Sequence, residues 1–397
     1  MDFRFSDEQK MLRQTVRSFV DAEIIPHISE WDAQGAFDPK IWTRLADLGL
    51  LGICIPEKYG GSGMDYNALA IACEELECGD TAFRTAVSVH TGLNSMTLLQ
   101  WGTEEQKQRY LIPQAKGEKI GAFGLTEPGA GSDVASMSSH AVLEGDYYRL
   151  NGQKTWISLC DIADYFIVFA YTDKEAKHHG ISAFIVEREM VGFSSKAIKG
   201  KYGIRSGNTG ELFFEDIMIP KENLLGQEGE GFKIAMSALD NGRFTVAAGA
   251  VGLIQACIEA SVRYSHERHT FGQAIGEHQL VKQMIAKMEA GYQMSRLLVY
   301  RAGELKNQGI RNTRETSLAK WQACDFANQA ADDAVQIHGA YGYSDDYPVA
   351  RYLRNSKAPV IYEGTREIHT LMQADYVLGN RQDKELSHTL PPWTFDF

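Results

Sequence analysis

The sequence predicts a mainly α-helical protein with a central β domain. Residues 1–119 have helical spacing of apolar positions, beginning with the capping box and apolar stripe of "SDEQKMLRQTVRSFV". Residues 120–229 are instead a series of short β-type runs separated by turn residues, and residues 230–397 return to long helical patterns. A doubly wound fold would alternate strands with helices, so this order implies three segregated layers. We therefore expect an N-terminal helical domain, a middle β domain and a C-terminal helical domain with these bounds.

The first segment divides at a clear loop. "PEKYGGSGMDY" at 56–66 concentrates turn residues, and helical spacing resumes over 67–79 and 85–101. The opening residues are charged from the second position, so they lack the apolar region of a secretory signal. The cysteines are scattered and never form CxxC, which fits reduced, buried thiols better than disulfides or a zinc site. Both features predict a soluble cytoplasmic protein.

The middle segment contains the β runs "YYRLNGQKTWIS", "YFIVFAYT", "ISAFIVERE" and "GELFFEDIMIP". Their spacing is that of a sandwich or barrel. The glycine-rich "GAGSD" lacks GxGxxG spacing and does not open a βαβ unit, and the chain contains no GxxxxGK. These observations exclude Rossmann and P-loop nucleotide sites.

The third segment contains two informative stretches. "VAAGAVGLIQACI" at 246–258 is apolar but too short to span a bilayer, and its small residues indicate a tightly packed bundle helix. "IYEGTREIH" at 361–369 begins a helix, for which Thr365 is the expected N-cap. Glu363 precedes that helix on a turn that Gly364 keeps sterically open. From this stretch alone, Glu363 is an acidic turn residue near a helix start.

Composition bounds the function classes. A chain of 397 residues with 44% hydrophobic content can bury one large core or several smaller ones. The formal net charge of −12 argues against a nucleic-acid footprint and against attachment to an anionic membrane. It leaves room for a local basic pocket that binds a phosphorylated ligand.

Six motifs, in order along nearly the whole chain, resemble those of the acyl-CoA dehydrogenase family of flavoenzymes. They are "FGLTEPGAGSD" (123–133), "KTWIS" (154–158), "ALDNGRFTVAAGAVG" (238–252), "ERHTFGQAIGEHQ" (267–279), "QIHGAYGY" (336–343) and "IYEGTREIH". The resemblance implies an N-terminal helical domain, a middle β-barrel-like domain and a C-terminal four-helix bundle. It also implies a homotetramer, built as a dimer of dimers, that holds FAD between subunits. Such an enzyme oxidises an acyl-CoA substrate and passes the electrons to electron-transferring flavoprotein.

The motifs suit a flavin, which needs hydrogen-bonding groups at its pyrimidine edge and an apolar or aromatic wall. The resemblance assigns FAD contacts in the middle domain to Phe123, Leu125, Thr126, Gly131, Ser132, Trp156, Ile157 and Ser158. It assigns contacts with a neighbouring subunit's pyrophosphate and adenine to Arg268, Thr270 and Phe271. The remaining FAD contacts that it implies are Gln279, Gln336, Gly339, Thr365 and Glu367. The alternative interpretations are a barrel-core tryptophan at 156 and a solvated basic helix end at "RHTF".

The resemblance gives Glu363 a catalytic role. In the family this acid takes the proton from the carbon α to the thioester while the β-carbon passes hydride to the flavin. A water-poor pocket raises the pKa of a carboxylate toward neutrality, which suits a base. The thioester carbonyl would be polarised by the Glu363 N–H and an FAD hydroxyl. Some relatives carry their base at the position of Gly242 instead. The other substrate contacts that the resemblance implies are Ser132, Asp240, Arg243, Tyr362 and Gly364.

The stretch "EELECGDTAFRTAVSV" at 74–89 bears on the acyl group. Glu77 and Arg84 are seven residues apart, so on a continuous helix they would share a face, two turns apart. By themselves they read as a surface salt bridge of little value. The pattern, with Thr85, resembles the glutaryl-CoA dehydrogenase branch, where the arginine binds the distal carboxylate of the substrate. We therefore expect a glutaryl-CoA type of substrate, with decarboxylation to crotonyl-CoA as a possible second step.

Two departures from that branch keep the acyl group open. Ser158 stands where the branch has threonine, and Thr85 stands where it has serine. A benzylsuccinyl-type or sulfinate-bearing ester would need a similar anion clamp, the latter with loss of its group and no net oxidation. A short- or medium-chain straight acyl group is the main alternative. A non-enzymatic scaffold would have lost Glu363, Thr126 and Arg268, and an acyl-CoA oxidase would carry a longer C-terminal region.

Overall fold

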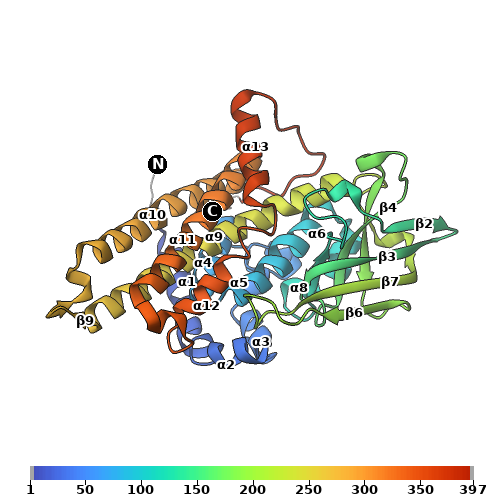
Figure 1. Ribbon diagram of the computed structural model, residues 1–397. Helices are drawn as coiled ribbons and strands as arrows, with labels where there is room; N and C mark the ends of the chain where they lie inside the picture. The colour runs from blue at the N-terminus through green and yellow to red at the C-terminus, as the bar shows by residue number, and fades with distance from the viewer. Residues whose placement is uncertain (1–3, 394–397) are drawn as a thin grey trace.

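The computed structural model describes residues 4–393; the ends of the first and third predicted segments, residues 1–3 and 394–397, lie outside it. Its elements follow the predicted order of helices, sheet and helices (Figure 1). Residues 119 and 229, where the first two segments are predicted to end, fall between α8 (Ile112–Ala115) and β1 (Gly121–Gly124) and between β8 (Leu224–Leu225) and α9 (Gly231–Glu267). The predicted fold class is confirmed.

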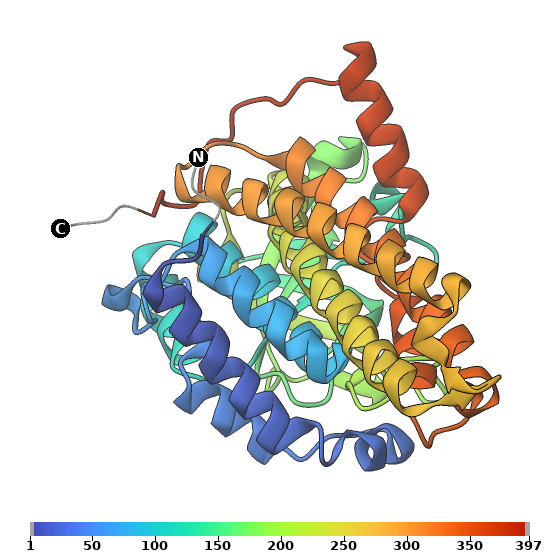
Figure 2. The ribbon, with the colours of Figure 1, turned by 90° about the vertical axis from the view of Figure 1, so that its left-hand side faces the viewer.

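The N-terminal helices lie beside the long C-terminal helices (Figure 2). They are α1 (Asp7–Phe19), α2 (Ile28–Gln34), α3 (Lys40–Asp47), α4 (Tyr66–Gly79), α5 (Thr81–Val87), α6 (Met96–Trp101), α7 (Glu104–Gln106) and α8. The predicted capping box is present, because the Ser6 and Gln9 side chains each accept a hydrogen bond from the other's backbone N–H. A buried π-helical segment, η4 (Ser88–Ser95), joins α5 to α6.

The segment that contains Glu77 and Arg84 is not one continuous helix, so the shared helical face considered for the two residues does not form. Asp80 has extended backbone angles (φ −166°, ψ 147°) between α4 and α5, and its carboxylate caps α5. The same carboxylate accepts a hydrogen bond from Asn355 at 2.8 Å and lies 3.1 Å from Arg351 Nε, both on α12 (Val349–Ser356). The predicted helical spans, 67–79 and 85–101, leave a gap at Asp80, and partners far along the chain hold that residue in place.

The middle segment forms an eight-stranded sheet. Its strands are β1, β2 (His140–Glu144), β3 (Tyr147–Ser158), β4 (Tyr165–Tyr171), β5 (Ile181–Glu187), β6 (Phe193–Ala197), β7 (Thr209–Pro220) and β8. The order is β6-β7-β3-β2-β4-β5-β8, and β1 pairs parallel with β4. The β3–β7 pair shifts register between Lys154 and Ile157, where Trp156 adopts φ +60°. Such a bulge changes the direction of a side chain, so that it no longer follows the alternation of the strand between its two faces.

The C-terminal segment is built around α9, which packs against α4, α10 and α11. Its other elements are the β9–β10 hairpin (His269–Thr270 and Gln273–Ala274), α10 (Gln279–Asn307), α11 (Thr313–His338), α12 and α13 (Arg366–Leu378). Residues 246–254 are all buried, as the predicted bundle helix requires. By length and hydropathy α9 is the one helix of residues 4–393 that could cross a membrane, but 72% of its most apolar window is buried inside the protein.

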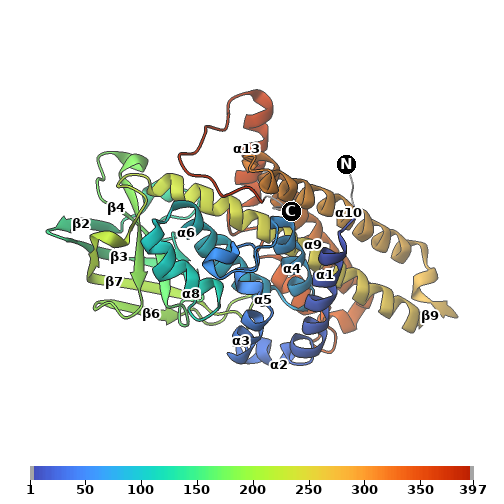
Figure 3. The same cartoon turned by 180° about the vertical axis from the view of Figure 1, so that it is seen from behind.

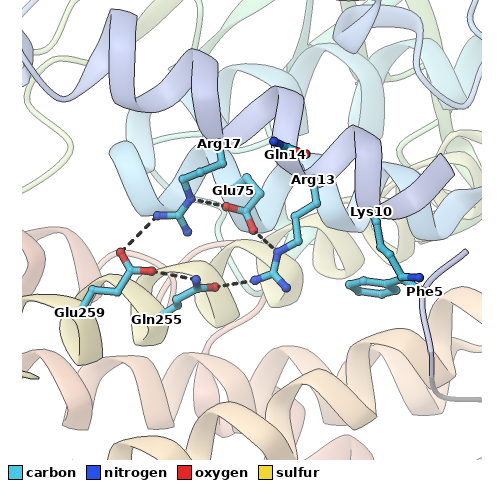
Figure 4. Close-up of a pocket in the computed structure, with 8 residues that line it drawn as sticks. All are labelled: Phe5, Lys10, Arg13, Gln14, Arg17, Glu75, Gln255 and Glu259. Atoms are coloured by element: carbon cyan, nitrogen blue, oxygen red, sulfur yellow. Dashed lines mark hydrogen bonds and ion pairs between the residues drawn. The ribbon is translucent and has the colours of Figure 1, made fainter. Parts of the chain in front are cut away.

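Charged side chains fasten α1 to α4 and α9 (Figure 4). Arg13 and Arg17 each place Nε 2.6 Å from the buried carboxylate of Glu75, and Arg17 Nη1 lies 3.2 Å from Glu259. A surface cavity of about 450 Å³ lies among these side chains. Two guanidinium groups compensate the desolvation of one buried carboxylate, so we interpret this cluster as structural.

The sheet and the β9–β10 hairpin lie at opposite ends of the molecule (Figures 1 and 3). α9 begins against β5, where a Cβ on Gly231 would meet the Ile181 carbonyl oxygen at 2.7 Å. This 37-residue helix ends immediately before the hairpin. At 1.5 Å per residue a helix of this length spans about 55 Å.

Candidate active site

Glu363 lies on the short loop between α12 and α13, in an unusual backbone conformation. Its φ is +54°, and that of Gly364 is +98°. The next residue, Thr365, is the N-cap of α13 as predicted, because its Oγ1 accepts the Ile368 N–H at 3.3 Å. A non-glycine residue in the left-handed region costs about 1–3 kcal/mol and persists only where the surroundings hold it.

The carboxylate of Glu363 lies against α9. A Cβ on Gly242 would be 2.1 Å from Glu363 Oε2, so only glycine fits beside it. Oε2 is shielded from solvent and has no hydrogen-bond partner within residues 4–393. Burial raises the pKa of Glu363 to about 7, against the opposing effect of the positive charges on Arg84, Lys320 and Arg243. An unpaired carboxylate that titrates near neutrality is suited to accept a proton from a ligand.

Two buried cations hold the carbonyl groups of the loop. Arg243 Nε donates to Glu363 O at 3.0 Å, and Lys320 Nζ donates to Gly364 O at 2.6 Å. Arg243 also pairs with Asp240 at 3.0 Å, and its side chain is only 7% exposed. The structure thus gives Arg243 a contact with the Glu363 loop, while its predicted contact with the substrate stays a prediction.

His369 supports the same loop from α13. It is fully buried, and its Nδ1 lies 2.8 Å from Ser317 Oγ on α11. A Cβ on Gly364 would meet His369 Nε2 at 2.8 Å, so the loop requires glycine there for space as well as for its φ. Burial lowers the pKa of His369 to about 3, which keeps the imidazole neutral beside the neighbouring cations.

Arg84 and Glu77 form a buried pair next to this loop, despite the break between their helices. Arg84 Nε donates to Glu77 Oε2 at 2.5 Å, and the two side chains are 1% and 0% exposed. Arg84 Nη2 donates to Tyr362 Oη, also at 2.5 Å. A Cβ on Gly249 of α9 would lie 2.6 Å from both Arg84 Nε and Glu77 Oε2, so glycine makes room for the pair. The interpretation as a surface salt bridge is wrong.

A polar loop follows β1 and lies against the end of β3. The Thr155 N–H donates to Thr126 O at 2.9 Å, which brings Thr126 beside the strand that carries Trp156 and Ser158. Trp156 is 61% exposed, so the interpretation as a barrel-core residue is wrong. Of the other predicted residues here, the buried ones are Phe123, Leu125 and Ile157, and the exposed ones are Gly131 and Ser132.

The second predicted FAD set lies far from this loop. Arg268, Thr270 and Phe271 lie at the β9–β10 hairpin, where Phe271 is 98% exposed at φ +52°. Gln279 begins α10 and Gln336 lies near the end of α11, followed by Gly339, while Glu367 is exposed in the first turn of α13. Because α9 separates the hairpin from the sheet, one FAD molecule cannot touch both within a chain. Within a single chain, the predicted FAD residues of the sheet therefore lie apart from those of the hairpin.

Comparison with known proteins identifies the family. The N-terminal, middle and C-terminal domain models of acyl-CoA dehydrogenase match residues 6–118, 122–217 and 229–378. The chain belongs to the acyl-CoA dehydrogenase family. A short-chain specific acyl-CoA dehydrogenase of Clostridium acetobutylicum is 43% identical over 94% of this chain and 98% of its own length. The glutaryl-CoA dehydrogenase of Desulfococcus multivorans is 41% identical over 96% of this chain and 99% of its own.

Solved structures agree with this assignment. A chain solved in work on the electron transferring flavoprotein of Acidaminococcus fermentans superimposes with a TM-score of 0.94 at 44% identity, covering 95% of this acyl-CoA dehydrogenase and 100% of that chain. The protein is therefore an FAD-dependent oxidoreductase. Its residues fit the cofactor, because a Cβ on Gly131 would meet nothing within 4 Å and exposed Trp156 offers an aromatic wall. When bound, FAD supplies the hydride acceptor of this acyl-CoA dehydrogenase.

Sequence reasoning missed two residues of the acyl-CoA dehydrogenase site, Lys320 and His369. A signal for Lys320 was present: it shares the buried face of α11 with Ser317, Cys324 and Ala327, a face otherwise made of small residues. A lysine in such a stripe is rarely buried without a specific partner. His369 lies within "IYEGTREIH", but its helical position alone did not reveal that its ring lies beneath Gly364.

Proposed function

We propose that the protein catalyses α,β-dehydrogenation of a short acyl-CoA thioester that carries a distal anionic group, with Glu363 as the base. The observation that supports this best is the buried Arg84, which is hydrogen-bonded to Tyr362, the residue directly before the base. A buried guanidinium beside a base loop is an unusual wall for a purely aliphatic acyl chain.

Glu363 removes the proton from the carbon α to the thioester carbonyl. Its unpaired Oε2 and its raised pKa support this role. The loop conformation turns the side chain toward Gly242, and the bonds from Arg243 and Lys320 keep that conformation fixed. In this proposal the Glu363 N–H donates to the thioester oxygen, which stabilises the negative charge that develops as the proton leaves.

Arg84 binds the distal anion. Its Nε and Nη2 are occupied by Glu77 and Tyr362, but Nη1 makes no hydrogen bond within residues 4–393. The Oγ1 of neighbouring Thr85 is likewise buried without a partner. The unpartnered Thr85 hydroxyl, on the residue after a guanidinium with a free nitrogen, supports a carboxylate ligand, because an unsatisfied buried polar group is otherwise costly. A glutarate-sized acyl group would satisfy both, and the Tyr362 and Ser158 hydroxyls are the candidates to assist a subsequent decarboxylation.

A short straight-chain acyl-CoA is the second candidate. Glu77 lies 2.5 Å from Arg84 and neutralises its charge without any ligand. A neutral pair attracts a distal carboxylate less than a free cation would. The short-chain relative from Clostridium acetobutylicum also supports this candidate.

Arg84→Ala separates the two candidates. If Arg84 binds a distal carboxylate, its removal strands a buried anion, and kcat/KM for glutaryl-CoA should fall roughly 30-fold or more. Butyryl-CoA, which has no distal charge, serves as the internal control and should be affected little. Lysine at this position should rescue only partly, because it cannot offer the geometry of a guanidinium. An unchanged ratio of the two kcat/KM values would favour the straight-chain candidate.

We further propose electron-transferring flavoprotein as the electron acceptor, a homotetramer as the assembly and the cytoplasm as the location. The similarity to a chain from work on an electron transferring flavoprotein supports the first. The separation of the two FAD sets along α9 supports an assembly in which each flavin touches two chains. All six cysteines are buried and free, which supports a reducing compartment.

A further inference from the structure

The chain continues beyond α13 as an extended segment, residues 380–393, which we name the C-terminal strap. The C-terminal family model ends before it, at residue 378. The strap runs from α13 back toward the N-terminal helices (Figure 2). Its far end is anchored there: Gln100 Nε2 donates to His388 O at 2.8 Å, Tyr66 Oη donates to Pro391 O at 2.7 Å, and Trp393 Nε1 donates to Gly63 O at 2.9 Å. The strap is therefore a fixed part of the fold.

The strap closes one side of a cavity of about 480 Å³. α9 lines it with Asp240 and Asn241, and the α10–α11 connection contributes Arg311. The strap contributes Asp383 and Lys384, and Asp383 Oδ1 lies 3.8 Å from Arg311 Nε. Three elements distant in sequence thus enclose one polar space.

Two buried groups in this cavity indicate a ligand. Asn241 is 2% exposed, and its Nδ2 has no hydrogen-bond partner within residues 4–393. Lys306 lies beside it, 8% exposed, with Nζ 2.8 Å from Asn241 Oδ1. Burial lowers the pKa of Lys306 to about 8, which an anionic ligand would reverse. An unused donor next to a buried cation suits an anionic, hydrogen-bonding group.

The cavity is connected to the base loop by a single turn of α9. Asp240 lines the cavity and pairs with Arg243, which in turn donates to the Glu363 carbonyl. A thioester whose acyl end lies at Glu363 must extend its carrier out of the protein. The carrier of a CoA ester bears phosphate groups, which favour a path past basic and amide side chains.

We infer that the C-terminal strap is a specificity-determining wall of the substrate site, which encloses the phosphorylated carrier end of the thioester and offers Lys384 to it. This inference rests on the proposed function, since it requires the acyl end to lie at Glu363. Lys384 faces the cavity from the strap, so it adds a positive charge that the matched family model does not include.

Two variants and two esters test the strap. Lys384→Ala, and a chain ending at Gly379, should each raise KM for butyryl-CoA by roughly 2- to 10-fold, the scale of one lost polar contact or a few. Butyryl-pantetheine, which has no phosphate, should keep its KM and kcat in both variants. Calorimetry with CoA alone should show binding weakened by the same factor as KM. Lys40→Ala, at the exposed start of α3, is the matched control and should change nothing.

The outcomes separate this inference from the proposed function. Equal changes for both esters in Lys384→Ala, or none for either, would overturn the role of the strap. If the shortened chain fails to fold, Lys384→Ala and the calorimetry decide alone. Wild-type protein that reduces its flavin with neither of these esters nor glutaryl-CoA would instead overturn the proposed function, whatever CoA binding shows.

Discussion

At Glu363, different neighbours constrain the backbone and the side chain. Arg243 and Lys320 hold two successive carbonyl groups, and His369 excludes any side chain at the next residue. The carboxylate itself packs on Gly242, where any Cβ would displace it. Backbone strain is thus offset by hydrogen bonds to buried cations, and the carboxylate stays unpaired. The consequence is a carboxylate that is fixed in place but free to accept a proton.

The raised pKa of Glu363 predicts a pH dependence. The ordinary value is 4.5 and the folded value about 7, so the carboxyl is protonated and inactive below neutrality. The rate of substrate-dependent flavin reduction should rise about tenfold per pH unit below about pH 7 and level off above it. Rapid-mixing absorbance measurements from about pH 5 to about pH 9 would check this. A rate that is flat or falling across neutrality would contradict it.

The sequence revealed some of these residue-scale features and not others. The N-cap at Thr365 and the open turn at Gly364 follow from local chemistry, so they could be predicted. Gly242 and Glu363 pack together although they are 121 residues apart in the sequence. No local sequence pattern encodes such a contact. The exposed Trp156 depends on a register shift against β7, which the alternation of β3 could not show.

At the scale of elements, α11 acts through one buried face. Ser317 holds His369, and one turn later Lys320 holds Gly364 O, so a single helix supports two points of the base loop. This role explains why a long side chain lies among small residues on that face. The break between α4 and α5 works similarly, since it allows Arg84 and Glu77 to meet as a buried pair.

Lys320→Met should slow flavin reduction roughly 10-fold or more at neutral pH, because the loop that positions the base loses a carbonyl contact. It should also move the pH profile upward, since the positive charge of Lys320 lowers the pKa of Glu363. Lys320→Arg should keep part of both effects. Lys287→Met, on exposed α10 surface, is the control. If the rate falls but the pH profile does not move, Lys320 supports the loop without influencing the pKa of Glu363.

At the scale of the whole molecule, the two sets of residues predicted to contact FAD lie toward opposite ends of α9. The loop of Thr126 and Trp156 lies at the sheet, and Arg268 and Phe271 lie at the hairpin (Figure 1). α13 also projects apolar side chains into solvent, namely Leu371, Val377 and Leu378, which are 62%, 74% and 71% exposed. Both features are accounted for if chains associate. The order of helical and β segments could be predicted from the spacing of apolar residues. The distance between the two predicted FAD sets could not, because it depends on the length and direction of α9.

Complementation tests the shared site. Trp156→Ala and Arg268→Ala should each lower FAD content when expressed alone, with sedimentation still showing dimers or tetramers. In mixed assemblies from co-expression, a symmetric two-chain site should regain both intact halves in roughly a quarter of the sites. FAD content measured by absorbance would check this. No recovery on mixing, or an active monomer, would contradict a flavin shared between chains.

Glu363→Gln tests the central claim most directly, because it keeps the shape of the side chain and removes the base. FAD content and the affinity for CoA should match the wild type. The rate of flavin reduction by substrate, followed in a single turnover without oxygen, should fall by at least ~10²-fold, the usual scale for losing a general base. Flavin reduction at close to the wild-type rate would show that another group takes the proton and that Glu363 is not the base.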